Sequence, residues 1–232
     1  MPATWIEPRP NGIYVAPADV WIDPAAPQPN AVITHGHADH ARSGHGQVWA
    51  TPETLAIMAL RYGTADGDAL PYGDGFERGG VRFSLHPAGH VLGSAQILLE
   101  YAGERVVVSG DYKRRADPTC IPFEPVACDV FITEATFGLP VFRHPPLAQE
   151  IAKLLARRAA EPDRCVLVGV YALGKAQRMI AELRHAGWHE PIFIHGALER
   201  MCRLYESFGI ELGALRLVSD TPREDMLSLI HI

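Results

Sequence analysis

Short apolar runs separated by turn residues fill the first 135 or so positions of the chain. Each run is too short for a stable helix and several are rich in β-branched or aromatic residues, so the runs predict β-strands. They cover residues 12–15, 20–22, 31–33, 47–50, 81–85, 95–99, 105–109 and 130–133. The pattern predicts two sheets, with Gly103 in the turn between two strands of the second.

One helix is predicted between the two sets of strands. Thr51 can cap its first turn and Pro52 fits the first helical position. Leu55 and Met58 then fall on one apolar face, and Gly63 is a typical end. We therefore expect one amphipathic helix that starts at Thr51–Pro52 and ends at Gly63.

The pattern changes after the loop that ends at Pro146. Helical periodicity over Leu147–Ala160 is followed by a continuously apolar run at Cys165–Val170, a second helix at Gly174–His185 and a strand at Ile192–Ile194. Alternation of this kind is typical of a parallel β/α arrangement. The fold class is therefore predicted as α/β (α+β), with a two-sheet part followed by a β/α part.

Composition agrees with a cytoplasmic globular protein that has no membrane segment. The 232 residues are 47% hydrophobic, enough for a core, and no apolar run approaches the length of a membrane span. The N-terminus lacks a basic stretch followed by an apolar one, and the four cysteines contain no C-x-x-C pair. A net charge of −6 argues against a globally basic coat for nucleic acid, although a local basic track would suffice for binding.

The segment His35-Gly36-His37-Ala38-Asp39-His40 carries the strongest chemical signal. Side chains alternate in an extended stretch, so His35 and His37 share one side and can bind one metal ion. Asp39 and His40 fall where the chain turns and can face a second ion.

Two further segments place a metal-binding side chain at the end of a strand. His90 lies within Ala88–Ala95, and Asp111 follows the apolar run that ends at Ser109. Imidazole suits Zn²⁺, Fe²⁺ or Mn²⁺, whereas a carboxylate can bridge two ions that lie about 3.5–4 Å apart. Asp111 is the candidate for that bridge.

These motifs, in this order, resemble the metallo-β-lactamase superfamily. The segments Ala88–Ala95, Ser109–Arg114 and Thr133–Gly138 are similar to its β-CASP branch, which comprises nucleases of DNA repair and RNA processing. The run Tyr171–Gln177 resembles the same branch. Taken together, the sequence is most similar to the bacterial DNA ligase-associated exonucleases.

The resemblance implies a fold, a set of ligands and a cofactor. Residues 1–140 would form the N-terminal portion of an αββα sandwich, and residues 141–221 part of an inserted β-CASP-like β/α domain. Two divalent ions, Zn²⁺ or else Mn²⁺, would be bound. The implied ligands are His35, His37 and His90 for one ion, Asp39 and His40 for the other, and Asp111 between them. Asp39, Asp111 and Glu134 would carry catalysis, with Glu134 just outside the ligand set.

Two elements that the branch normally has after its inserted domain are missing from the sequence. One is a Ser-x-His-x-Asp segment with a catalytic histidine, and the other is a final His-Gly ligand. His195-Gly196 imitates the latter but follows a strand inside the inserted region, so we do not expect it to bind metal. Residues 222–232 have no counterpart in the family, and we expect a truncated or non-native tail and a fragment that binds metal yet cuts poorly.

Basic residues near the motifs are candidates for contacts with substrate. Lys113 and Arg114 follow Asp111 closely enough to meet a phosphate, but a solvated surface cluster explains them equally well. Lys175 lies near the start of a predicted helix, in a segment that resembles a P-loop. The resemblance is incomplete, because Ala176 stands where a P-loop has the Ser or Thr that binds Mg²⁺. The N-terminus of this helix either contacts a substrate phosphate or is an ordinary helix cap with a solvated Lys175.

The function that the resemblance implies is metal-dependent phosphodiester hydrolysis. DNA is favoured over RNA as the nucleic-acid partner, with digestion from an end in repair and with a DNA ligase as a possible partner protein. Three alternatives stay open: an RNase of the same branch, a small-molecule hydrolase of the thioesterase or lactonase type, and an inactive metal-binding scaffold. The helical region after Leu147 counts against the small-molecule enzyme, and the intact ligand positions count against the scaffold.

Overall fold

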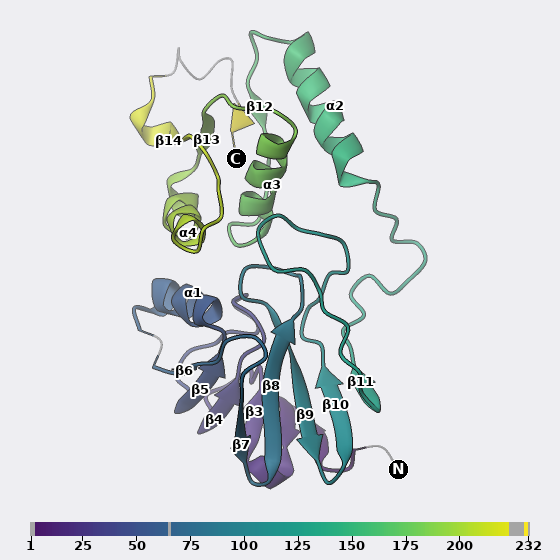
Figure 1. The fold of residues 1–232 in the computed structure, drawn as a ribbon. Helices are drawn as coiled ribbons and strands as arrows, with labels where there is room; N and C mark the ends of the chain where they lie inside the picture. Colours follow the sequence, from purple (N-terminus) through teal and green to yellow (C-terminus); the bar gives the residue numbers. More distant parts are fainter. Residues whose placement is uncertain (1–2, 65, 223–229, 232) are drawn as a thin grey trace. The chain divides into compact units, whose positions relative to one another are not determined.

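Two β-sheets form most of the first part of the chain (Figure 1). Hydrophobic side chains from both sheets pack against one another in a shared core. The computed structural model describes residues 3–64, 66–222 and 230–231. The chain divides into two compact units, Met1–Glu134 and Ala135–Ile232. The predicted domain boundary at residue 140 remains a prediction.

The first sheet of unit 1 is antiparallel on one side and parallel on the other. Its strands, in spatial order, are β1 (Ile6–Arg9), β2 (Gly12–Val15), β3 (Val20–Ile22), β4 (Asn30–Val32), β5 (Gln47–Ala50) and β6 (Asp68–Ala69). β1 to β3 pair antiparallel, and β3 to β6 pair parallel. Because β3 and β4 run in the same direction, the loops that follow them leave from the same edge of the sheet.

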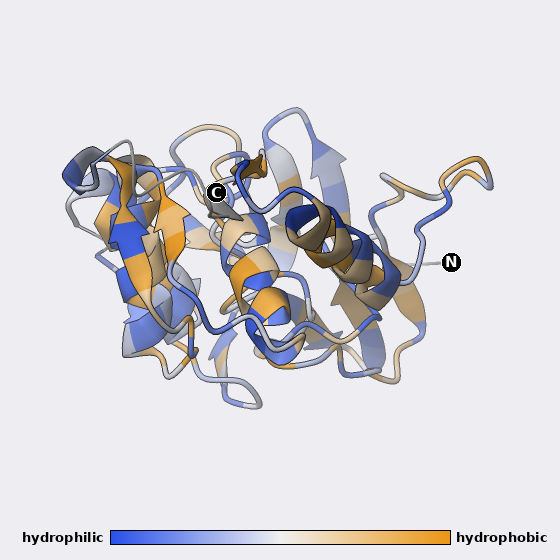
Figure 2. Cartoon of the chain, turned by 90° about the horizontal axis from the view of Figure 1, so that it is seen from above, coloured by the Kyte–Doolittle hydropathy of each residue, from blue (hydrophilic) through white to orange (hydrophobic). Residues whose placement is uncertain are grey.

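The second sheet holds the longer strands. In spatial order they are β11 (Val130–Ile132), β10 (Glu104–Val108), β9 (Ala95–Tyr101), β8 (Val81–Pro87) and β7 (Gly75–Arg78). Alternate residues such as Phe83, Leu85 and Ile97 are fully buried between the sheets, where they meet Val15 and Val32 of the first sheet. Figure 2 shows hydrophobic and hydrophilic residues interspersed along the helices and strands of the chain. The predicted two-sheet arrangement is confirmed.

Helix α1 (Pro52–Tyr62) covers the outer face of the first sheet. Thr51 Oγ1 accepts a hydrogen bond from the backbone N–H of Thr54 at 3.2 Å, and Gly63 ends the helix at a φ of +88°. Leu55 and Met58 pack with alanine and valine side chains of β4 and β5. The predicted helix, its cap and its apolar face are confirmed.

An irregular segment covers the outer face of the second sheet near β8 and β9. Ala95 and Ile97 point into the core between the sheets, so Gln96 lies on the opposite face. The Gln96 side-chain amide donates to the backbone carbonyls of Pro87 and Glu124, which holds the segment around Glu124 against that face. Within the described part of unit 1, α1 is the one α-helix, and it lies against the first sheet.

Unit 2 contains a small parallel sheet and three helices within its described residues. The helices are α2 (Leu147–Ala160), α3 (Lys175–His185) and α4 (Gly196–Ser207), and the strands in spatial order are β12 (Val166–Leu167), β15 (Ile230–His231), β13 (Ile192–Ile194) and β14 (Leu215–Leu217). Every strand pair is parallel. The predicted β/α pattern and the helices over 147–160 and 174–185 are confirmed, although Gly174 is the cap that precedes α3.

The strand expected at Cys165–Val170 is much shorter than the pattern predicted. Only Val166–Leu167 pairs, at the edge of the sheet, and Leu167 is 75% exposed. An apolar run does not show whether a strand will have one neighbouring strand or two. Here the strand lies at the edge of the sheet and has a single partner. Most of the tail predicted to be non-native, residues 223–229 and 232, lies outside the described residues, while Ile230–His231 forms β15.

Within the described residues, every helix falls short of the length and hydrophobicity that crossing a membrane would require.

Candidate metal centre

The histidine-rich segment leaves the first sheet directly after β4. His35 is fully buried, and its Nδ1 lies 3.0 Å from Thr34 Oγ1. Thr34 Oγ1 in turn donates to Asp23 Oδ2 at 2.5 Å, so its oxygen can accept a hydrogen bond from the ring N–H of His35. This arrangement places the His35 proton on Nδ1 and turns the lone pair of Nε2 toward the centre of the site.

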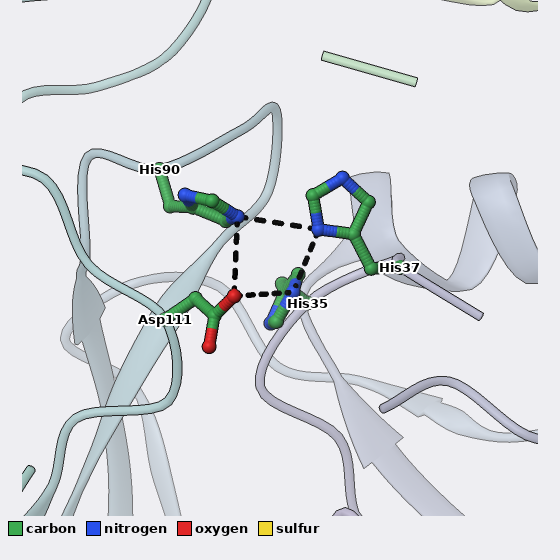
Figure 3. Close-up of side chains that lie close together, drawn as sticks. All are labelled: His35, His37, His90 and Asp111. Carbon is green, nitrogen blue, oxygen red and sulfur yellow. Dashed lines mark hydrogen bonds and ion pairs between the residues drawn. The ribbon is translucent and has the colours of Figure 1, made fainter. Parts of the chain in front are cut away.

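Three imidazoles and one carboxylate converge on a single point (Figure 3). His37 Nδ1 lies 3.0 Å from His35 Nε2 and 3.2 Å from His90 Nε2. Asp111 Oδ2 lies 3.9 Å from His35 Nε2 and 3.5 Å from His90 Nε2. Ligands of a tetrahedral Zn²⁺ with bonds of about 2.0–2.1 Å are separated by roughly 3.3 Å, so the four atoms stand at suitable spacing for such an ion.

A tight loop between β8 and β9 positions His90. The Ser94 hydroxyl accepts hydrogen bonds from the backbone N–H groups of His90, at 2.9 Å, and Val91, at 3.1 Å. The Gly93 carbonyl accepts from the hydroxyl of Thr51 at 2.7 Å, which ties the loop to the start of α1. Ser94 is therefore a structural part of the site that the sequence motif did not explain.

Asp111 comes to the site because Gly110 lets its loop approach the histidine segment closely. Gly110 has a φ of +52°, and a Cβ at this position would lie 2.7 Å from the Cβ of Thr34. A side chain would be strained both by the backbone conformation and by the missing space. The Gly-Asp pair after β10 thus has a steric reason as well as a chemical one.

The second oxygen of Asp111 faces the remaining part of the motif. Asp111 Oδ1 lies 3.5 Å from His40 Nε2, and Asp39 Oδ2 lies 3.8 Å from the same nitrogen. The Asp39 side chain is 76% exposed, so it stands at the solvent side of this group. One carboxylate therefore has one oxygen toward the three-histidine group and the other toward His40. The role of Asp111 as a bridge between two ions remains a prediction.

Asp23 is a member of the site that the sequence analysis missed. It follows β3, and its Oδ2 lies 2.8 Å from His40 Nδ1. Its Oδ1 accepts the backbone N–H of Thr34 at 2.7 Å. The only signal in the sequence is an acidic residue directly after a buried apolar strand, which by itself does not say what it contacts.

Burial and neighbouring charges shift the pKa values of the ligands in opposite directions. Burial, with help from the other histidines, lowers the pKa of His35 well below its usual value and that of His90 to about 4. Burial also opposes the charged form of His40, but the hydrogen bond and charge of Asp23, with the charges of Asp111 and Asp39, outweigh it and raise the pKa to about 9. Burial raises the pKa of Asp111, partly offset by the nearby His40.

The donor set fits a divalent transition metal. Imidazole nitrogens and a single carboxylate are the ligands that Zn²⁺ takes in proteins, whereas Mg²⁺ and Ca²⁺ prefer oxygen. His35 and His90 are neutral at pH 7, which is the form that binds metal. The residues therefore suit the ion that the resemblance implies.

Glu134 and the basic candidates have different surroundings. The Glu134 backbone N–H donates to Ser109 Oγ at 3.3 Å. The negative charge of Glu134 opposes the lowering of the His90 pKa and contributes to the raised pKa of Asp111. The Lys113 ammonium pairs with the buried carboxylate of Asp117, so its charge is already matched within the protein.

Arg114 is exposed, and Lys175 lies in unit 2 as the first residue of α3, 5.7 Å from the centre of the Tyr171 ring. The substrate roles of Lys113, Arg114 and Lys175 remain predictions. His195 accepts the backbone N–H of Ala197 at 3.1 Å and so caps α4.

Comparisons with known proteins give relatives for most of the chain. A probable DNA ligase from Opitutus terrae is 33% identical over 207 residues, which cover 86% of this chain and 20% of that protein. Endoribonuclease YSH1 from Mycosarcoma maydis is 29% identical over 76% of this chain and 25% of its own length. Cleavage and polyadenylation specificity factor subunit 3 from Dictyostelium discoideum is 28% identical over 74% and 27%, respectively. The chain thus spans between a fifth and about a quarter of these relatives.

No protein-family model matches the sequence. Among solved structures, a protein of unknown function from Enterococcus faecalis V583 aligns with a TM-score of 0.60 at 14% identity, over 87% of this chain and 58% of that one. This likeness supports the fold.

Proposed function

We propose, from the premise that homologues of this chain are members of the β-CASP branch of the metallo-β-lactamase superfamily, that its metal centre hydrolyses phosphodiester bonds. That relationship confirms the resemblance of the sequence motifs. The finer proposal is a DNA exonuclease that acts in repair together with a DNA ligase. DNA is proposed because one relative, 33% identical over 207 residues, is named a probable DNA ligase.

The observation that carries the proposal is the position of Asp111 between two groups of ligands. Its Oδ2 faces His35 and His90, and its Oδ1 faces His40. Two divalent ions bound on either side would supply Lewis acidity, lowering the pKa of a water molecule and stabilising charge on the phosphate oxygens. Zn²⁺ is the ion that this donor set favours, with Mn²⁺ as the second candidate.

The protein's own residues hold this arrangement. Asp23 fixes the ring of His40 through Nδ1 and leaves Nε2 directed at the proposed second ion. Asp39, largely exposed beside His40, would complete the second group on its solvent side. Glu134 places a further negative charge near His90 and Asp111, where it would help to hold a proton during the reaction.

The experiment measures metal content and cleavage together. The full-length gene product, read to its native stop codon, is loaded with Zn²⁺ or Mn²⁺ and incubated with end-labelled DNA and RNA, beside an Asp111→Asn variant. Asp68→Asn, on the exposed edge strand β6, is the matched control for loss of a carboxylate. We expect release of label from DNA that Asp111→Asn abolishes and Asp68→Asn preserves.

The other outcomes decide between the alternatives. Cleavage of RNA alone would make the chain an RNase, the function that the names of the endoribonuclease relatives favour. Full metal content without cleavage of either nucleic acid would contradict the proposal and favour a small-molecule hydrolase or a metal-binding scaffold.

A further inference from the structure

An exposed aromatic loop, residues 137–144, stands apart from the rest of the described surface. Phe137 is 60% exposed, Leu139 65%, Val141 75% and Phe142 45%. Four large apolar side chains within six positions form an exposed hydrophobic patch of the kind that marks an interaction site. In Figure 1 the loop is part of the irregular trace between β11 and α2.

The loop is held in shape by two turns and by ring contacts. The backbone N–H of Gly138 donates to the Ala135 carbonyl at 3.0 Å, and that of Phe142 donates to the Leu139 carbonyl at 3.1 Å. The second turn has Pro140 in its second position, where proline presets the backbone angle. Because these turns already restrict the backbone, the loop loses less conformational entropy when its rings bind a partner.

The rings of Phe137, Phe142 and His144 form one cluster. The centroids of Phe137 and Phe142 are 5.3 Å apart at an interplanar angle of 82°, and those of Phe137 and His144 are 5.0 Å apart at 89°. Both pairs are edge-to-face, the favoured arrangement for isolated aromatic pairs. Since the three rings are not stacked face to face on one another, ring surface is left for a further planar group.

The charge of the loop is opposite in sign to that of the chain. The chain carries a net charge of −6, yet residues 135–149 contain no Asp or Glu and include Arg143 next to Phe142. Arg143 is itself exposed. A partner with flat apolar groups and regularly spaced negative charges is complementary to such a surface.

We infer that this aromatic loop binds single-stranded nucleic acid, with unpaired bases on Phe137 and Phe142 and a backbone phosphate on Arg143. The inference rests on the proposed nuclease function and specifies its substrate as a strand with unpaired bases. Base stacking on aromatic rings tolerates any sequence because every base has a π-face, and paired bases inside a duplex do not offer theirs. A surface that docks another protein would use the same apolar residues, but the lack of carboxylates beside the arginine favours a polyanion.

The test measures binding without cleavage. Fluorescence anisotropy in the presence of a chelator compares a short labelled single strand with the blunt duplex of the same sequence, in an Asp111→Asn background. The variants are Phe137→Ala and Phe142→Ala. Phe208→Ala, at the end of α4 and 37% exposed, is the matched control for removing an exposed phenyl ring.

We expect each loop variant to bind the single strand about tenfold more weakly, with duplex binding and the unfolding midpoint unchanged. Arg143→Gln should make the plot of log affinity against log salt concentration less steep, by the amount expected for the loss of about one phosphate contact. Equal single-strand affinity in the loop variants and in Phe208→Ala would overturn the inference. So would equal losses for duplex and single strand, or a change in self-association with no loss of nucleic-acid binding.

Failure of this inference and failure of the proposed function are distinguishable. Binding is measured with no metal and no turnover, so a chain that binds single strands but cuts nothing contradicts the nuclease and leaves the loop assignment intact. A chain that cuts with unchanged activity in the loop variants contradicts the loop assignment alone.

Discussion

The carboxylate of Asp23 lies 2.8 Å from Nδ1 of His40, across a gap of 17 positions in the sequence. The same carboxylate accepts the hydroxyl and the backbone N–H of Thr34, which contacts Nδ1 of His35. One side chain thus orients histidines on both sides of the proposed two-metal centre. Partners of this kind fix which ring nitrogen carries the proton.

Asp23→Asn should weaken metal binding without removing a ligand. Loss of such an outer partner typically costs about 10–100-fold in metal affinity, and here His40 is the histidine that depends on it directly. Titration calorimetry with Zn²⁺ should show a weakened component, while the affinity of Asp68→Asn is unchanged. Two variants with the same binding curve would show that Asp23 does not act on the metal centre.

The stability of the metal-free chain should fall at alkaline pH because of His40. Its pKa is raised to about 9, so the stabilisation is present in full below the unfolded value of about 6.5 and is lost as pH rises through about 9. The shift corresponds to at most about 3 kcal/mol. Urea unfolding with a chelator at pH 7 and pH 10 measures the loss, and Asp23→Asn should remove most of it. A loss of equal size in both proteins would assign it to other groups.

The stability of the metal-free chain should also fall at acidic pH, in this case because of histidines whose pKa values are lowered. The pKa of His90 is lowered to about 4 and that of His35 lies well below its usual value, so the folded chain binds fewer protons than the unfolded one between about pH 4 and 6.5. The stability contributed by these neutral histidines is therefore lost as pH falls through that range. His90→Gln should flatten the acid limb of the unfolding profile, and a limb as steep as in the parent would contradict this assignment.

Gly110→Ala should damage both stability and metal binding, whereas Gly103→Ala should damage stability alone. Both glycines have positive φ, and each alanine should cost about 1–2 kcal/mol for the left-handed backbone. Only at Gly110 would the new Cβ meet another atom, Thr34 Cβ at 2.7 Å, because nothing lies within 4 Å at Gly103. We expect a further cost of about 1–3 kcal/mol from overpacking and a loss of Zn²⁺ affinity at Gly110. Equal effects of the two substitutions would mean that the loop around Gly110 shifts away from Thr34 with no added loss of stability or metal affinity.

Lys113 and Arg114, adjacent in sequence, should respond differently to substitution by glutamine. Lys113 pairs with Asp117, whose side chain is only 3% exposed, so Lys113→Gln leaves a buried carboxylate without its cation and should cost about 2 kcal/mol of stability. Arg114 is exposed, and Arg114→Gln should change stability by no more than about 0.5 kcal/mol.

If Arg114 contacts substrate phosphate, its loss should raise KM and weaken the salt dependence of binding while Lys113→Gln acts through unfolding. Chemical denaturation and a salt titration of nucleic-acid binding separate the two. An unchanged unfolding midpoint in Lys113→Gln would contradict the structural role of Lys113 and favour its predicted contact with substrate phosphate.

The local elements of this protein follow from its sequence because their causes are local. Thr51, Pro52 and Gly63 mark both ends of α1 through capping and backbone preference, and the alternation in β8 and β9 separates core from outer face. The sequence also predicted that His35, His37, His90 and Asp111 would act together, because all four follow strands, and the structure brings these four side chains close to one another. The predicted length of the strand at Cys165–Val170 was wrong, because an apolar run does not reveal whether a strand lies at the centre or the edge of a sheet.

Only the tertiary structure decided which of these residues meet and how. Asp23 joins the site because β3 and β4 run parallel side by side, so the loops after both strands leave the same edge of the sheet. Lys113 turns to Asp117 because the loop that carries both covers a buried carboxylate, and Gly110 is required because that loop passes against Thr34. The sequence by itself determined the ligand types, the strands and the helix ends, since these depend on neighbours along the chain. The pairing of charges and the close approach of backbones depend on neighbours in space, which no local pattern records.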